Sequence, residues 1–260
     1  MKTFQDLQEG VYDPNILKAF FLAGGPGSGK SYVVKRGTGG LGLKIVNSDD
    51  TFEKYIKDAG LSMKMPKSQE EPRDKLRDRA KAITKKKLDN YVDGRLGLII
   101  DGTGKEYDKI AKQATGLKQL GYDVHMIFVN TSLETALKRN AARDRTVPRS
   151  IATKSWKTVQ SNMGKFSQYF RQNFIVVDNN DSDEDVMGPV YKQVMSLAKK
   201  KVNNPIAKRW IANELEMKKD SGGAGTLGKG RGGGRKQTID PEKAAEIKKG
   251  GFSKFARRTR

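Results

Sequence analysis

The stretch Phe20-Phe21-Leu22-Ala23-Gly24-Gly25-Pro26-Gly27-Ser28-Gly29-Lys30-Ser31 decides the fold of this chain. Residues 20–23 are apolar and predict a buried strand, residues 24–31 fit the pattern G-x-x-x-x-G-K-[ST], and residues 32–36 are compatible with a helix. Glycines let the backbone N–H groups of such a loop point inward, and the following helix adds partial positive charge. The sequence therefore predicts a strand, loop and helix that bind a nucleoside triphosphate.

Each position of this loop has an expected role. Lys30 is expected to reach the β- and γ-phosphates, and Ser31 is expected to supply an oxygen to Mg²⁺. A glycine-rich turn that binds nothing is the alternative, which the strand before it and the helix after it disfavour. We therefore predict ATP and Mg²⁺ as cofactors, with the triphosphate held by Gly25, Pro26, Gly27, Ser28, Gly29, Lys30 and Ser31.

Short apolar runs recur along the chain, separated by longer polar segments with helical periodicity. Strands that alternate with helices predict βαβ units and a parallel sheet covered on both faces. We expect an α/β fold with a five-stranded parallel sheet in a three-layer αβα core. The predicted strands are 19–23, 43–46, 98–100, 124–129 and 174–177, and the longer predicted helices are 68–91, 132–145, 184–202 and 205–217.

Composition limits the function further. Among 260 residues, 51 Lys and Arg against 30 Asp and Glu give a net charge of +21, which favours nucleic acid or phosphorylated partners. The absence of cysteine excludes disulfides, a thiolate zinc site and a cysteine nucleophile, and the single histidine, His125, is expected to be packed in a strand. No apolar segment is long enough for a membrane span, so we expect no membrane partner and a cytoplasmic location.

The chain divides by composition into two parts. Residues 1–217 are expected to form the P-loop domain, and residues 218–260 a flexible, glycine-rich, basic tail with a short helix over 240–249. The helix predicted over 68–91 carries many Lys and Arg residues. These form either a solvated face or a basic rim for an anionic substrate.

The third predicted strand distinguishes between types of P-loop chemistry. It ends in Asp101-Gly102, so a single carboxylate is present that can hold Mg²⁺ or its water shell, without a second one to activate water. No Asn-Lys-x-Asp segment is present to read guanine. Both features favour transfer of phosphate to a hydroxyl group, which is the reaction of a kinase, over hydrolysis.

A kinase of this kind needs a base near the γ-phosphate and cations around it. The second predicted strand is followed by Asp49 and Asp50, of which one can accept the substrate proton while the other caps the next helix. Arg139 and Arg143 are four residues apart and share a face of the predicted helix 132–145, where they can stabilise the transferred phosphoryl group. The alternative is an exposed basic helix end that interacts with its own dipole.

An ordered set of motifs resembles the zeta toxin and polynucleotide 5'-kinase group of P-loop kinases. The likeness covers most of residues 16–180 and rests on segments 24–31, 47–52, 99–103, 121–124 and 137–148. It implies the sheet order 2-3-1-4-5, a substrate groove across the carboxyl edge of the sheet, and a helical lid whose arginines are Arg139, Arg143 and, as a third, Arg145. The zeta toxin pattern selects Asp50 as the base, which we favour, and the polynucleotide kinase pattern selects Asp49.

The chain departs from the family pattern at one position, and the resemblance also implies partner molecules. Relatives often have Arg or Lys after the aromatic residue at position 52, whereas this chain has Glu53, which weakens the case for a nucleic-acid 5' end as acceptor. Toxins of the group usually have a neutralising partner protein. We expect a kinase that uses ATP to phosphorylate a hydroxyl of a nucleic acid, nucleotide or nucleotide sugar, with nucleic acid contacted through the basic surface and tail. The alternative is a nucleic-acid-binding accessory protein with a regulatory ATP-binding loop.

Overall fold

The computed structural model describes residues 11–13, 15–38, 40–64, 66–143, 145–180 and 187–220. A five-stranded parallel sheet forms its centre, with the order β2-β3-β1-β4-β5, which confirms the expected α/β fold and strand order. Each predicted strand is present. The strands are β1 (Lys18–Ala23), β2 (Lys44–Val46), β3 (Leu98–Asp101), β4 (Asp123–Asn130) and β5 (Phe174–Asp178).

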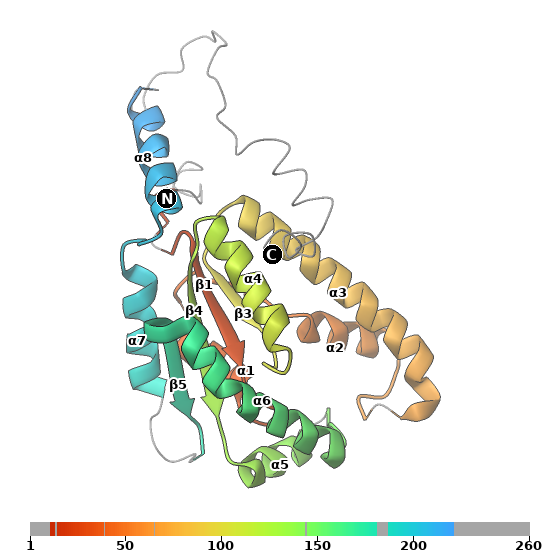
Figure 1. Cartoon of the computed structure of the whole chain (residues 1–260). Coiled ribbons are helices and arrows are strands. Elements are labelled where there is room, and N and C mark those ends of the chain that lie inside the picture. Colours follow the sequence, from red (N-terminus) through yellow and green to blue (C-terminus); the bar gives the residue numbers. More distant parts are fainter. Residues whose placement is uncertain are drawn as a thin grey trace, which may run out of the picture.

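Helices cover both faces of the sheet (Figure 1). Alternation along β1 directs Phe21 into one core and Phe20 and Leu22 into the other, because successive side chains of a strand point to opposite faces. α1 (Lys30–Gly37) and α7 (Met187–Lys199) cover the Phe20 face. The Phe21 face is covered by the second half of α3 (Glu70–Asp93) and by α4 (Tyr107–Gln119), α6 (Arg149–Phe170) and α8 (Pro205–Asp220).

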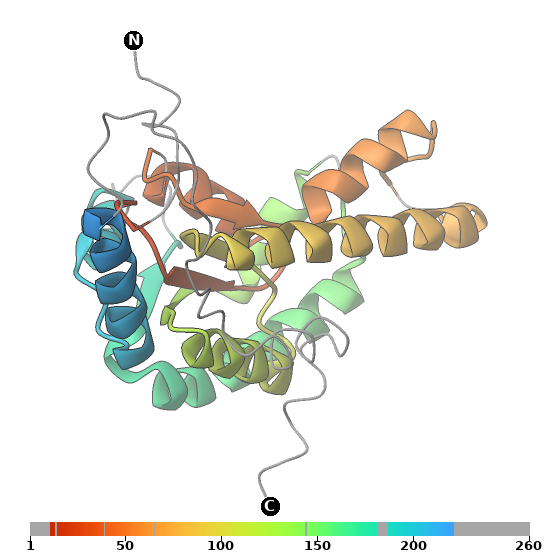
Figure 2. The ribbon, with the colours of Figure 1, turned by 90° about the horizontal axis from the view of Figure 1, so that it is seen from above.

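A helical hairpin projects beyond the sheet (Figure 2). We call it the arm: α2 (Asp49–Asp58), the short 3-10 helix η2 (Lys67–Gln69) and the first half of α3, residues 70–84. The arm has a small hydrophobic core of its own, formed by Phe52 and Ile56 from α2 with Ala80 from α3. The same α3 helix therefore belongs to the arm at one end and to the main core at the other.

The helix expected over 132–145 is wrong in its last four residues, 142–145. α5 (Leu133–Ala141) ends at Ala141, and the link 142–148 then leads into α6. The side-chain amide of Asn140 closes this link, because its Nδ2 donates to the Val147 carbonyl (2.7 Å) and its Oδ1 accepts from the Val147 N–H (3.2 Å). Arg143 lies on the link, so Arg139 and Arg143 do not share a helix face.

The amino edge of the sheet is held by a buried ion pair. Lys18, which is 2% exposed, places Nζ 2.9 Å from Oδ2 of Asp123. The same carboxylate accepts hydrogen bonds from the backbone N–H groups of Asn203 and Asn204, between α7 and α8. His125 is buried and stacked on Phe20, with ring centroids 4.8 Å apart, and burial lowers its pKa to about 4, as fits a packed histidine.

The remaining expectations concern the end of the chain. α8 continues to Asp220, beyond the expected domain boundary at 217. The basic tail from 221 onward, with the helix expected over 240–249, lies outside the described residues. No helix within the described ranges is long and apolar enough to cross a membrane.

Candidate active site

The glycine-rich loop lies at the carboxyl edge of β1, between α5 and the chain that follows β5. Gly27 and Gly29 have φ values of 82° and 89°, the left-handed region that favours glycine. A Cβ on Gly27 would overlap the Ala136 carbonyl, and one on Gly29 would overlap the Asn179 amide nitrogen. Asn179 Nδ2 also donates to the Ser28 carbonyl (2.7 Å), so the loop conformation is fixed by contacts from both sides.

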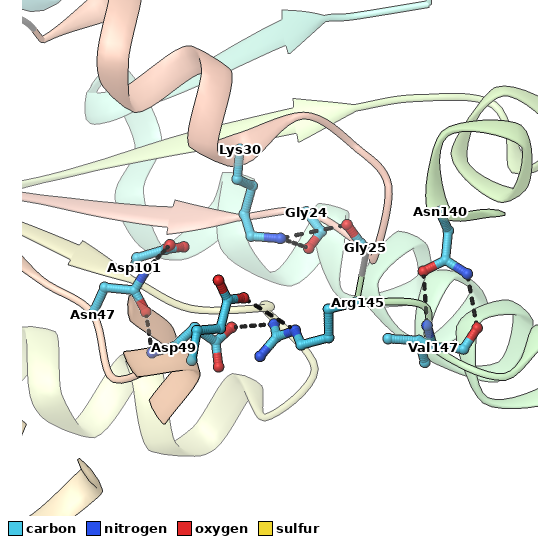
Figure 3. A network of polar contacts seen from close by, with 10 residues as sticks. Gly24, Gly25, Lys30, Asn47, Asp49, Asp101, Asn140, Arg145 and Val147 are labelled. Carbon is cyan, nitrogen blue, oxygen red and sulfur yellow. Dashed lines mark hydrogen bonds and ion pairs between the residues drawn. The ribbon is translucent and has the colours of Figure 1, made fainter. Parts of the chain in front are cut away.

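Lys30 opens α1 and turns back over this loop (Figure 3). Its Nζ donates to the Gly24 carbonyl at 2.7 Å and lies 3.4 Å from that of Gly25. Burial lowers the pKa of Lys30, although the nearby Asp101 carboxylate acts in the opposite direction. The predicted phosphate-binding lysine is therefore placed at the mouth of the loop, beside a carboxylate.

Asn47 connects the two carboxylates of the site (Figure 3). Its Nδ2 donates to Asp101 Oδ2 (3.0 Å), and its Oδ1 accepts from the backbone N–H of Asp49 (2.7 Å). The sequence motif 47–52 includes Asn47 but did not predict this role. The amide holds the end of β3 and the start of α2 at a fixed separation.

Asp101 keeps one oxygen unpaired. Its Oδ1 is buried and has no hydrogen-bond partner among the described residues. Burial raises the pKa of Asp101, the charges of Asp49 and Asp50 raise it further, and Lys30 lowers it. A buried carboxylate oxygen without a partner suits a ligand that brings positive charge or hydrogen-bond donors.

Asp49 and Asp50 both lie in the first turn of α2, but their surroundings differ. Asp49 is half-buried and forms an ion pair with Arg145, with 3.0 Å between Oδ2 and Nη2, whereas Asp50 is exposed. Burial raises the pKa of Asp49, but the hydrogen bond and charge of Arg145, followed by the charges of Arg77 and Lys30, leave it below its usual value. Asp49 therefore stays ionised and faces the loop.

The arginines of α5 and of the link after it separate into two groups. Arg145 contacts Asp49 and also places Nε 3.2 Å from Oε1 of Glu53, and both Arg143 and Arg145 lower the pKa of Lys30 by repulsion. Arg139 instead donates to the backbone carbonyls of Asn179 (2.6 Å) and Asn180 (3.3 Å). Arg145 thus contacts the site, the charge of Arg143 acts on Lys30, and Arg139 joins α5 to the chain after β5.

The residues present fit a magnesium ion that is shared with a nucleotide. Ser31 follows Lys30 on α1, and Asp101 offers its unpaired oxygen. Among the described residues, no three His, Asp or Glu side chains are grouped so that they could hold a metal by themselves. Kinase sites commonly bind Mg²⁺ through one or two protein oxygens together with substrate phosphates, and this arrangement matches that pattern.

A cavity of about 180 Å³ adjoins Asp101 on the α4 side of the sheet. It lies where β1 and β3 end. Its lining includes Asp101, Thr103, Gly104, Glu106 and Gln113. Open α/β sheets bind ligands outside the carboxyl ends of their strands, which is where this cavity lies.

Comparisons with known proteins find a matching family and similar folds. The family model described as zeta toxin matches residues 6–186. The chain is similar in structure to a protein of the PezAT chromosomal toxin–antitoxin system of Streptococcus pneumoniae, with a TM-score of 0.50, 18% identity, and coverage of 76% of this chain and 91% of that one. A search of curated proteins found no match.

Two further solved structures show weaker likeness. Shikimate kinase from Acinetobacter baumannii, in complex with shikimate, gives a TM-score of 0.42 at 15% identity and covers 73% of this chain and 97% of that one. A chain of the Pnkp1/Rnl/Hen1 RNA repair complex gives 0.46 at 20% identity, covering 58% of this chain and 47% of that one.

Proposed function

This chain belongs to the zeta toxin family, and from that premise we propose that it transfers the γ-phosphoryl group of ATP to a hydroxyl of a nucleic acid, nucleotide or nucleotide sugar. It is a P-loop kinase, that is, a phosphotransferase with an alcohol group as acceptor. The observation that carries the finer proposal is the ion pair of Asp49 with Arg145 close to Lys30 at the carboxyl edge of the sheet.

Each residue of the site has its own role in phosphoryl transfer. Lys30 and the loop N–H groups bind the phosphates, and Ser31 with Asp101 would hold Mg²⁺, which neutralises developing charge when bound. Asp49 orients the acceptor hydroxyl and accepts its proton as the oxygen forms its bond to the γ-phosphorus. The bond from that phosphorus to the bridging oxygen breaks, and ADP leaves. Arg143 and Arg145 stabilise the negative charge on the group in transfer.

Asp49 fits the role of base better than Asp50, which we favoured from the sequence pattern. Asp49 is held by Asn47 at its backbone and by Arg145 at its carboxylate. Asp50 is exposed, and its charge raises the pKa of Asp101. A base needs a fixed position close to the reacting hydroxyl.

The test is transfer of labelled phosphate from ATP to nucleotides, oligonucleotides and nucleotide sugars. We expect Asp49→Asn to lower kcat by about 10²- to 10⁴-fold, because general base catalysis contributes about that much. Asp50→Asn is the matched control, one residue away in the same helical turn, and should change kcat by less than about threefold. If Asp49→Asn keeps its rate and Asp50→Asn loses it, the assignment is reversed. If neither variant is impaired, no base of this kind operates.

We also propose that a neutralising partner protein binds this chain. The structurally similar PezAT protein is described as part of a toxin–antitoxin system, and the family match supports the same arrangement here. Expression of the wild type in bacteria should then arrest growth, and Lys30→Ala should relieve the arrest. Equal growth with both would argue against a toxic kinase activity.

A further inference from the structure

Asp49 and Glu53 lie four residues apart on α2, so their carboxylates are on the same face of the helix, in successive turns. One guanidinium contacts both. Arg145 places Nη2 3.0 Å from Asp49 Oδ2 and Nε 3.2 Å from Glu53 Oε1. The side chain of Arg145 therefore bridges two turns of α2 from the link between α5 and α6.

Two contacts restrict this guanidinium more than one contact would. The group is planar and its N–H donors have fixed directions, so a single hydrogen bond leaves it free to turn about that bond, whereas a second one fixes its plane. The backbone of Arg145 lies on the non-helical link, outside the regular hydrogen bonding of α5 and α6. The contacts with Glu53 and Asp49 together therefore set the orientation of the Arg145 side chain.

The third nitrogen of Arg145 has a different environment. Nη1 is buried and has no hydrogen-bond partner among the described residues. A buried N–H group without a partner is unfavourable, and more so when it is charged. Because Nε and Nη2 are taken by the two carboxylates, Nη1 is the donor that remains for an anionic ligand.

We propose that Glu53 is a positioning residue for phosphoryl transfer: it holds Nε of Arg145 so that Nη2 stays on Asp49 and Nη1 is presented to the transferred phosphoryl group. This inference rests on the proposed kinase function, which places Arg145 at that group. Glu53 acts through Arg145 and not on the substrate. The Arg145 and Glu53 side chains are 21% and 37% exposed, so their ion pair contributes little to the stability of the fold.

The first experiment measures steady-state kinetics with an acceptor from the panel above. We expect Glu53→Ala to lower kcat by about 10- to 100-fold, because a catalytic group displaced by about 1 Å can lose that much. The KM values for ATP and acceptor should stay within about threefold, since the orientation of Arg145 matters mainly in the transition state. Glu53→Gln keeps an oxygen that accepts from Nε and should retain more of the rate. The melting temperature of both variants should stay within about 4 °C of wild type.

Asp58→Ala is the matched control. Asp58 is an exposed carboxylate at the end of the same helix, so this variant removes the same charge from α2. We expect its kcat to stay within about twofold of wild type. An equal loss in Asp58→Ala would attribute the effect to the charge of the helix. A kcat in Glu53→Ala that is unchanged or higher would show that Glu53 does not hold Arg145 in a productive position. Each of these results overturns the proposal.

A double-mutant cycle tests whether Glu53 acts through Arg145. In the Arg145→Met background, Glu53→Ala should change kcat by less than about twofold, because the group that it positions is gone. If the losses of the two single variants multiply in the double variant, the proposal is wrong, since Glu53 then affects the reaction by a route of its own.

A measurement without substrate separates this proposal from the kinase function. The pKa of the Asp49 carboxyl is followed by NMR of labelled carboxyl carbons in the ligand-free protein. Arg145 lowers this pKa, and so do the charges of Arg77 on α3 and Lys30 on α1. Asp101, at the end of β3, also interacts electrostatically with Asp49. Arg77, Lys30 and Asp101 are present in every variant compared, so a change in this pKa reports on the position of Arg145 and on the charge that is removed.

These two effects have opposite signs in Glu53→Ala. Loss of the Glu53 charge by itself would lower the pKa of Asp49, because a neighbouring negative charge is removed, whereas displacement of Arg145 would raise it. We therefore expect a higher pKa of Asp49 in Glu53→Ala than in wild type, in the same direction as in Arg145→Met, and no change in Asp58→Ala. A rise supports the positioning role even if no acceptor in the panel is phosphorylated. A fall, or no change, overturns it even if phosphoryl transfer is found.

Discussion

Asp101 is a residue whose ionisation lowers the stability of the folded chain. Burial and the charges of Asp49 and Asp50 raise its pKa, so the folded protein holds this proton to higher pH than the unfolded chain does. Between the usual value and the raised one, the folded state binds more protons, and stability falls as the pH rises through that window. At a pH above that window, the carboxylate is therefore a destabilising group.

We predict that Asp101→Asn stabilises the free protein and impairs its reaction. The neutral amide can still accept a hydrogen bond from Asn47 and removes repulsion from the neighbouring aspartates. The melting temperature at pH 7 should rise by about 2 to 4 °C, as a gain of about 1 kcal/mol gives in a protein of this size. Transfer should fall by at least about 10²-fold. A lower melting temperature in calorimetry would contradict the electrostatic account.

Arg145 sets the charge state of the proposed base. Burial alone raises the pKa of Asp49, and Arg145 is the largest influence that lowers it. In Arg145→Met, the acidic limb of the kcat/KM profile should therefore move to higher pH. Lys138→Met, which removes an exposed lysine from α5, should leave that limb in place. A profile whose height falls without a shift would show that Arg145 acts only on the phosphoryl group.

At the scale of elements, the link after α5 depends on one side chain. Asn140 is 3% exposed, and both of its polar ends pair with the Val147 backbone. This pairing ends α5 and directs residues 143 and 145 toward the loop. A helix continued to 145 would place them differently.

We expect Asn140→Ala to lower the free energy of unfolding by about 1 to 3 kcal/mol, because it leaves buried backbone groups of the link unpaired. It should also lower kcat more than the KM for the acceptor, since the arginines act on the transferred group. Asn140→Asp keeps one accepting oxygen and should lose less stability. Chemical denaturation and steady-state kinetics measure both effects. Full activity in Asn140→Ala would show that the link keeps its shape without this amide.

The strands and the phosphate loop could be predicted from the sequence because their signals are local. A continuous apolar run marks β1, and the glycine pattern that follows it fits one loop. The end of α5 was missed because the apolar and basic periodicity of residues 132–145 continues past Ala141, whereas the contact of Asn140 with Val147 that follows the helix depends on the folded structure. Arg77 appeared only as one member of a basic run, since its stacking on Phe52 depends on how α3 lies against α2.

On the scale of the whole molecule, the two edges of the sheet have different roles. The carboxyl edge gathers the loop, Asp49 and Asp101, whereas the amino edge holds the buried pair of Lys18 and Asp123. The pair joins the starts of β1 and β4 to the turn before α8. It therefore supports the fold at a distance from the reaction.

We predict that Lys18→Met lowers the free energy of unfolding by about 3 kcal/mol, because it leaves a largely buried carboxylate without its counter-charge. Lys75→Met is the control. It removes a pair of similar length, 2.8 Å to Glu71, whose side chains are 75% and 81% exposed, and should cost less than about 1 kcal/mol. Urea denaturation compares the two. The KM for ATP should be unchanged in both variants, and a large rise in Lys18→Met would show that the edges are coupled.

The length of α3 has a mechanical consequence. Its 24 residues span about 36 Å, rooted at Leu88 in the main core and reaching the arm at Ala80. Arg77 thus lies on a long, continuous helix, whereas Arg143 and Arg145 lie on the non-helical link after α5. We expect slow amide deuterium uptake over 76–84, and faster uptake at Arg143, Arg145 and Thr146 than at Ala142 and Val147, whose N–H groups are hydrogen-bonded. Side chains on the arm would then keep their positions before a substrate binds, and conformational changes during the catalytic cycle would be concentrated in the link.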